Sequence, residues 1–154
     1  MSLPWHAAFP SPRTIAASIP RDRLLQWMQQ GRVPGKDYVV VDLRRTDHEG
    51  GTIKHSLNLP AQTLYPSLPT LYEMLAAAGV KHVLWFCGSS AGRGTRAANW
   101  FADLLEDRGD RSMQSLVLQG GIKGWVAAGE DYRACMEGFD ERVWVESGVL
   151  GGSQ

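Results

Sequence analysis

The stretch His82-Val83-Leu84-Trp85-Phe86-Cys87-Gly88-Ser89-Ser90-Ala91-Gly92-Arg93-Gly94-Thr95-Arg96-Ala97 decides how this chain folds. An apolar run over residues 82–86 predicts a buried strand, and the run ends directly in Cys87. Small residues follow, and an amphipathic segment suited to a helix begins near Arg93. The order is therefore strand, loop and helix.

The loop between strand and helix is suited to binding an anion. Small residues allow backbone N–H groups to converge on one point, and the helix that follows adds the positive end of its dipole. A thiolate is favoured at a helix N-terminus beside an arginine, so Cys87 is the candidate nucleophile. The candidate oxyanion-binding residues are Gly88, Ser89, Ser90, Ala91, Gly92 and Arg93.

The spacing of this loop disfavours nucleotide binding. No Lys-Ser or Lys-Thr pair follows the glycines, as a Walker loop requires. The acidic residue that dinucleotide sites need after the next strand is replaced by Gln119. What remains is Cys87, five residues and Arg93, a span that can surround a tetrahedral oxyanion while the guanidinium binds two of its oxygens.

Length, charge and cysteine content limit the class of protein. A chain of 154 residues is suited to one domain, and 16 basic residues balance 16 acidic ones. We therefore expect no nucleic-acid partner and no membrane attachment. No apolar run approaches the ~18 residues of a membrane-spanning helix. We expect Cys87 and Cys135 to be free thiols rather than a disulfide. We expect the protein to be cytoplasmic, with a nuclear location as the alternative. We expect it to be a monomer or weak dimer without a bound cofactor.

Strands and helices alternate along the chain, which is typical of an α/β fold. We expect an extended segment over residues 1–17, a catalytic domain over 18–132, and a docked C-terminal extension with a flexible end over 133–154. A first helix is expected to open at Ser18 and Pro20 and to end at Gly31, with Ile19 and Met28 on its apolar face. The further expected strands span 38–41, 56–59 and 114–119, and the further expected helices span 64–79, with Met74 on its apolar face, 93–108, and a short segment around Trp125.

Three further segments carry a resemblance to a known family. Asp42-Leu43-Arg44 resembles the Asp-x-Arg that follows the first buried strand in the rhodanese superfamily. The stretch from Gly51 to Pro60 and the closing Gly120-Gly121, Trp125 and Gly129 also match that family's patterns in order. The resemblance, from about residue 18 to 132, implies a single rhodanese-like α/β domain with a central, mostly parallel sheet and helices on both faces.

Within that superfamily, the loop of this chain resembles in length the loop of one branch. Sulfurtransferases carry a loop one residue shorter, whereas the cell-division-cycle dual-specificity phosphatases and the eukaryotic arsenate reductases have Cys, five residues and Arg. The resemblance implies that Cys87 and Arg93 are catalytic, with a small oxyanion or a phosphorylated molecule as substrate. For an arsenate reductase it also implies glutathione or a glutaredoxin as electron donor. Two positions depart from the phosphatase pattern, where Phe86 replaces a His and Gly92 replaces a Glu.

The general acid is not assigned by the sequence. Asp47, Glu49, Asp140 and Glu141 lie in loops or in the C-terminal extension, where solvated carboxylates are common. The missing acid favours arsenate reduction or a small phosphorylated substrate over a protein phosphatase. Two alternatives stay open, namely sulfur transfer through a Cys87 persulfide and a non-catalytic module that binds a protein.

The remaining candidates have supporting roles. Asp42 and Arg44 are expected to form an ion pair that braces the active loop. Cys135 is a candidate resolving thiol for oxidised Cys87. His48 and His55 lie seven residues apart, a spacing that does not indicate a metal site, so no metal is predicted.

Overall fold

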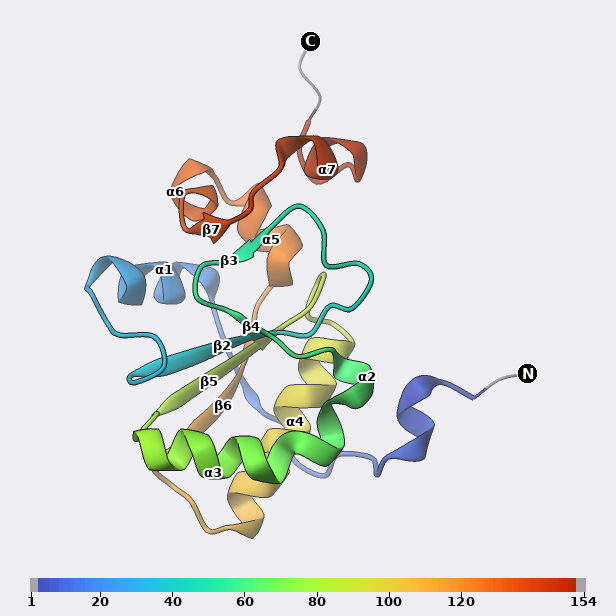
Figure 1. Ribbon diagram of the computed structural model, residues 1–154, viewed down its shortest axis with the longest axis vertical. Helices are drawn as coiled ribbons and strands as arrows, with labels where there is room; N and C mark the ends of the chain where they lie inside the picture. Colours follow the sequence, from blue (N-terminus) through green and yellow to red (C-terminus); the bar gives the residue numbers. More distant parts are fainter. Residues whose placement is uncertain (1–2, 152–154) are drawn as a thin grey trace.

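The centre of the molecule is a parallel sheet of five strands, in a computed structural model that describes residues 3–151. All neighbouring strands in this sheet run parallel, and their order is β1-β6-β5-β2-β4 (Figure 1). β5 is the middle strand, so the loop that follows it opens at the centre of the carboxyl edge. The strands are β1 (Ala17–Ile19), β2 (Tyr38–Asp42), β4 (Leu57–Asn58), β5 (His82–Phe86) and β6 (Gln114–Leu118).

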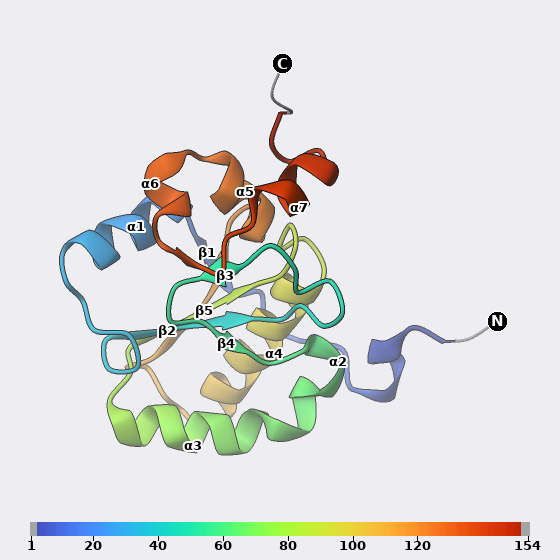
Figure 2. The same cartoon turned by 45° about the horizontal axis from the view of Figure 1, so that its top comes forward.

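Helices cover both faces of the sheet (Figures 1 and 2). Successive strand residues point to opposite faces, and so Val41 and Trp85 join the core cluster under α3 and α4, whereas Val40 and Phe86 join the cluster under α1 and α5. This confirms the α/β fold predicted from the sequence. The helices are α1 (Arg21–Gln29), α2 (Ala61–Leu64), α3 (Leu68–Ala78), α4 (Arg93–Asp107), α5 (Gly121–Ala127), α6 (Glu130–Arg133) and α7 (Glu141–Glu146), with 3₁₀ turns η1 (Trp5–Ala8) and η2 (Tyr65–Ser67).

The predicted start of the first helix was wrong. Residues 17–19 form the edge strand β1, with Ile19 opposite Leu118 of β6, and the helix begins at Arg21 after Pro20. A strand of three residues shows too little alternation to be seen in the sequence. The buried face of α1 is completed by Trp27 rather than by Met28, which is half-buried.

The single helix predicted over residues 64–79 is divided in the structure. α2 passes through η2 into α3, with Pro66 in the 3₁₀ turn where its missing N–H is tolerated. The buried side of α3 runs through Leu68, Leu71 and Leu75, and Met74, which was expected in the core, is 64% exposed.

Segments near both ends of the described chain pack on this core. Trp5 and Phe9 make edge-to-face contacts with Trp100 of α4, at ring-centroid distances of 6.0 and 5.9 Å. β3 (Thr52–Ile53) and β7 (Met136–Glu137) form a separate antiparallel pair, which the sequence did not predict. The expected flexible end includes residues 152–154, which lie outside the described residues.

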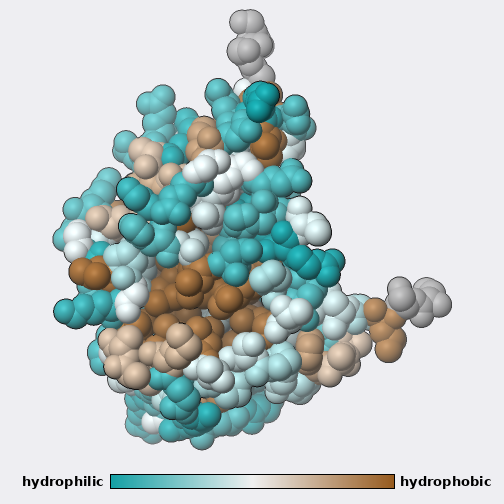
Figure 3. All heavy atoms as spheres, viewed as in Figure 1, coloured by the Kyte–Doolittle hydropathy of each residue, from teal (hydrophilic) through white to brown (hydrophobic). Residues whose placement is uncertain are grey.

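An apolar area is visible on the face of the molecule drawn in Figure 3. Figure 3 shows apolar side chains gathered in the hollow between α1 and α3. Leu57 of the edge strand β4 is 45% exposed. Among residues 3–151, no helix combines the length and apolar character needed to cross a membrane.

Candidate active site

The sulfur of Cys87 lies at the floor of the predicted loop. Cys87 is 3% exposed, and its Sγ accepts hydrogen bonds from the backbone N–H groups of Ser90 at 3.2 Å and Gly94 at 3.4 Å. The helix α4 begins at Arg93, so its N-terminal turn faces the same atom. The sulfur therefore meets converging backbone dipoles, as a nucleophilic thiolate requires.

The curvature of the loop is fixed by Ser90. This residue adopts a left-handed conformation with φ of +66°, is 4% exposed, and accepts a hydrogen bond from Thr95 Oγ1 at 2.7 Å through its carbonyl. A Cβ at Gly94 would lie 3.1 Å from Ser90 Cβ, so α4 and Ser90 are closely packed at this glycine. The loop is thus held around the sulfur by its own residues.

A cavity of about 450 Å³ opens above Cys87. Four parts of the chain outside the loop contribute to its walls: Trp5 from η1, Asp47 from the loop before β3, Gln62 from α2 and Lys123 from α5. Sequence reasoning missed Trp5, Gln62 and Lys123. Only Lys123 had a signal, because it lies two residues after the Gly-Gly pair of the resemblance.

Not every predicted oxyanion-binding residue faces this cavity. Gly88, Ser89, Gly92 and Arg93 line it together with Cys87. The N–H of Ser90 is directed to the sulfur, and the N–H of Ala91 lies 3.4 Å from Ser89 Oγ.

Arg93 is paired with Asp47 across the mouth of the cavity. Its two terminal nitrogens donate to the two carboxylate oxygens of Asp47 at 2.9 and 2.6 Å. These hydrogen bonds hold the pKa of Asp47 well below its ordinary value, and they raise the pKa of Arg93. Asp47 is therefore ionised, and in this arrangement it has no proton to donate as a general acid.

The other candidate acids lie elsewhere. Asp140 caps the N-terminus of α7 by accepting a hydrogen bond from the Arg142 N–H at 3.1 Å. Glu49 and Glu141 are exposed, and neither lines the cavity.

The ion pair of Asp42 and Arg44 is fully buried, at 0% and 1% exposure. Arg44 donates from Nε and one terminal nitrogen to Asp42, and it also donates to the carbonyls of Glu49 and Gly51 at 3.1 and 2.8 Å. Thr52 Oγ1 completes the site by donating to Asp42 Oδ2 at 2.7 Å. The pair therefore braces the loop that carries Asp47, rather than the Cys87 loop that was expected.

The Gly-Gly pair before α5 allows that helix to approach the Cys87 loop. Ile122 and Lys123 donate their N–H groups to the carbonyls of Cys87 and Gly88, both at 3.0 Å. A Cβ on Gly121, whose φ is +58°, would lie 2.6 Å from each of these carbonyl oxygens. Only glycine fits there, which explains the motif in physical terms.

Cys135 lies away from Cys87. It packs against the core cluster under α1 and α5, whereas Cys87 belongs to the cluster on the opposite face of the sheet. Burial, followed by the proximity of Cys135 and Asp37, raises the pKa of Tyr38 at the amino end of β2. The two thiols are free and are not brought together.

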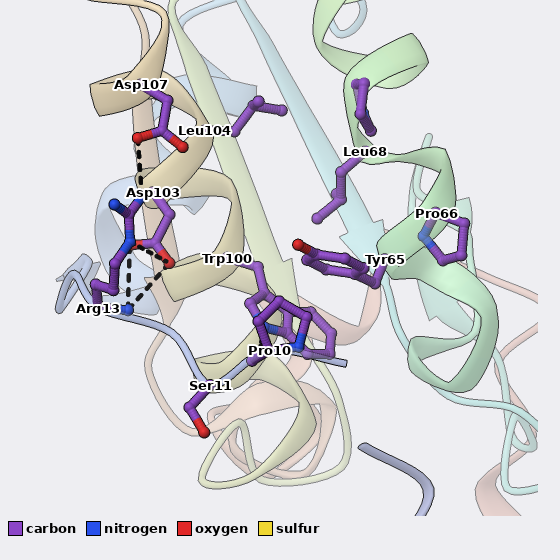
Figure 4. Close-up of a pocket in the computed structure, with 11 residues that line it drawn as sticks. Pro10, Ser11, Arg13, Tyr65, Pro66, Leu68, Trp100, Asp103, Leu104 and Asp107 are labelled. Atoms are coloured by element: carbon purple, nitrogen blue, oxygen red, sulfur yellow. Dashed lines mark hydrogen bonds and ion pairs between the residues drawn. The ribbon is translucent and has the colours of Figure 1, made fainter. Parts of the chain in front are cut away.

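A second cavity, of about 370 Å³, lies between the N-terminal segment and the helices α3 and α4 (Figure 4). Trp100 Nε1 donates to the carbonyl of Pro10 at 2.8 Å, and Arg13 binds Asp103 and Asp107 of α4. These contacts hold the segment that follows Trp5, which lines the cavity above Cys87. Across the described range, no three His, Cys, Asp or Glu side chains gather as metal ligands.

Solved structures of known proteins share this architecture. The yeast protein Ygr203w, described as a protein tyrosine phosphatase of the rhodanese family, has 26% sequence identity and a TM-score of 0.73, over 86% of this chain and 99% of that one. An As-Sb reductase from Leishmania major has 24% identity and a TM-score of 0.63, over 69% of this chain and 73% of that one. At 24% identity, the similarity to the reductase concerns the fold alone.

A shorter match involves a third class. Thiosulfate sulfurtransferase from Pseudomonas aeruginosa has 24% identity and a TM-score of 0.50, over 78% of this chain and 19% of that one. No curated protein matches the chain by sequence. The model of the rhodanese-like domain matches residues 21–128, which include the sheet from β2 to β6, the Cys87 loop and α5. This chain belongs to the rhodanese-like domain family.

Proposed function

We propose that this protein is a cysteine-dependent phosphatase that hydrolyses phosphomonoesters through Cys87. The observation that carries the proposal is the sulfur at the floor of an open cavity, bound by the N–H groups of Ser90 in the loop and Gly94 in α4, with Arg93 at the mouth. The likeness to the yeast phosphatase supports it. The five-residue span between Cys87 and Arg93 suits a tetrahedral oxyanion.

The reaction has two steps. The Cys87 thiolate attacks phosphorus, the P–O ester bond breaks with its electron pair, and the alcohol leaves with a proton from the solvent. Water then attacks phosphorus, the S–P bond breaks, and phosphate and the thiolate are released. Loop N–H groups and Arg93 hold the negatively charged oxygens in both steps.

The leaving group limits the first step. General acid catalysis contributes ~10²–10⁴-fold, and the Asp47 carboxyl is ionised in its pair with Arg93. An ester with a stable leaving group, such as an aryl phosphate, depends less on that help. We therefore expect aryl phosphates to be cleaved much faster than alkyl phosphates.

Arsenate reduction is the second candidate, because that reaction makes a weaker demand on a leaving-group acid. Cys87 would displace one oxygen of arsenate as water. A thiol such as glutathione would then attack the Cys87 sulfur, releasing arsenite while the two sulfurs are oxidised to a mixed disulfide, which a glutaredoxin reduces. The scheme uses an external thiol because Cys135 packs against the core cluster on the other face of the sheet.

The test compares activities of purified protein. We expect hydrolysis of p-nitrophenyl phosphate that is lost in Cys87→Ser and retained in the matched Cys135→Ser variant. Arsenate with glutathione and glutaredoxin tests the second candidate. A mass increase of one sulfur on Cys87 after thiosulfate treatment would instead favour sulfur transfer. Alkylation of Cys87 by iodoacetamide no faster than an ordinary thiol at pH 6 would favour a non-catalytic module.

A further inference from the structure

We propose that Asp47 is the general base of the second step, activating the water that hydrolyses the phosphorylated Cys87. The inference rests on the proposed phosphatase function. Asp47 is the one carboxylate among the described residues that line the cavity above Cys87. The other acidic residues considered from the sequence are outside it.

The position of Asp47 is fixed from both sides. Its backbone lies in the loop that Arg44 holds through the carbonyls of Glu49 and Gly51. Its carboxylate binds Arg93, which belongs to the same cavity as Cys87. The side chain of Asp47 is 50% exposed, so water reaches it. A base in such a position lies at the open side of the loop, from which the hydrolytic water must come.

A phosphoryl group on Cys87 would release Asp47 from Arg93. A carboxylate and a phosphoryl group bind a guanidinium in the same bidentate manner, so they compete for the same pair of N–H donors. The phosphoryl group carries more negative charge and lies within the converging loop N–H groups, so it is the stronger partner. Asp47 is then an ionised carboxylate without its main partner, with Arg93 and Lys123 as the neighbouring cations in the cavity.

The step balances as follows. Asp47 takes a proton from water as the water oxygen bonds to phosphorus, and the S–P electron pair returns to the Cys87 sulfur. Phosphate leaves, Asp47 loses the proton to solvent, and its pair with Arg93 forms again. The low pKa of Asp47 in that pair ensures that it starts each cycle ionised. The site therefore has a base for the second step.

The test is pre-steady-state hydrolysis of p-nitrophenyl phosphate by wild type, Asp47→Asn and Glu49→Gln. The amide oxygen of the first variant can keep the hydrogen bond that Asp47 accepts from the Arg45 N–H at 3.1 Å. The matched control removes the same charge from an exposed residue of the same loop. We expect Asp47→Asn to release p-nitrophenol in a burst close to one equivalent and then to turn over about 10²-fold more slowly. We expect Glu49→Gln to behave as wild type.

A second readout follows the intermediate itself. Acid-quenched Asp47→Asn should carry one phosphoryl group on Cys87 by mass spectrometry, and Asp47→Glu should restore part of the turnover. Wild-type turnover in Asp47→Asn, or loss of the burst together with turnover, would overturn the role of Asp47 while the phosphatase function stands. If wild type and Cys87→Ser are equally inactive, the phosphatase function fails, and this inference fails with it.

Discussion

Replacing Gly121 by alanine should displace the Cys87 loop. The resulting loss of folding stability has two parts. The left-handed conformation at φ of +58° costs a non-glycine residue about 1 kcal/mol. The new Cβ would also lie 2.6 Å from the carbonyl oxygens of Cys87 and Gly88, which must move away. That movement breaks the hydrogen bonds from Ile122 and Lys123, each contributing about 1 kcal/mol. The expected loss of stability is about 3 kcal/mol.

Gly109→Ala is the matched control for the conformational part. Gly109 has a φ of +64°, and a Cβ there would meet nothing within 4 Å, so we expect a loss of only about 1 kcal/mol. In thermal unfolding, Tm should fall by about 3 °C for Gly109→Ala and about 9 °C for Gly121→Ala. Gly121→Ala should also change the rate of Cys87 alkylation, which the control should leave unchanged. Equal losses of stability in the two variants would refute the argument from steric contact.

Three other variants test contacts elsewhere in the fold. Arg44→Met leaves the Asp42 carboxylate buried without its partner and should cost about 3–5 kcal/mol in urea unfolding; a loss below 1 kcal/mol would contradict this role. Trp144→Phe removes the hydrogen bond from Nε1 to Gly50, at 2.8 Å, and should cost about 1 kcal/mol with little change in activity; an unchanged urea midpoint would argue against that contact. Burial lowers the pKa of His82, so the unfolded chain binds more protons, and stability should fall as pH drops below about 6.5. His82→Gln should flatten that pH dependence, and an unchanged slope would show that another group is responsible.

The sequence predicted the parts of the fold that are local and strongly patterned. The β-branched run before Asp42 and the apolar run before Cys87 are long enough to reveal buried strands, and both are buried in the structure. The loop between Cys87 and Arg93 could be recognised because its residues are adjacent in the sequence. Gly120-Gly121 was recognised by resemblance, and the structure gives the steric reason.

What the sequence did not reveal depends on contacts between distant segments. β1, β3 and β7 have only two or three residues each, too few for a periodic signal, and each is defined by its partner strand. The cavity above Cys87 brings Trp5, Asp47, Gln62 and Lys123 together from four separate elements. Asp47 was recognised only as a loop carboxylate, because its pairing with Arg93 spans 46 residues of sequence.

The support that Trp144 gives to Gly50 also sets an order of events during synthesis. Trp144 is made 94 residues after Gly50, which at about 5–20 residues per second is a delay of roughly 5–20 s. During that delay the growing chain already contains the Cys87 loop, but the segment that carries Asp47 has yet to gain its contact with α7. A growing chain would therefore contain its Cys87 loop for several seconds before the indole of Trp144 can support Gly50.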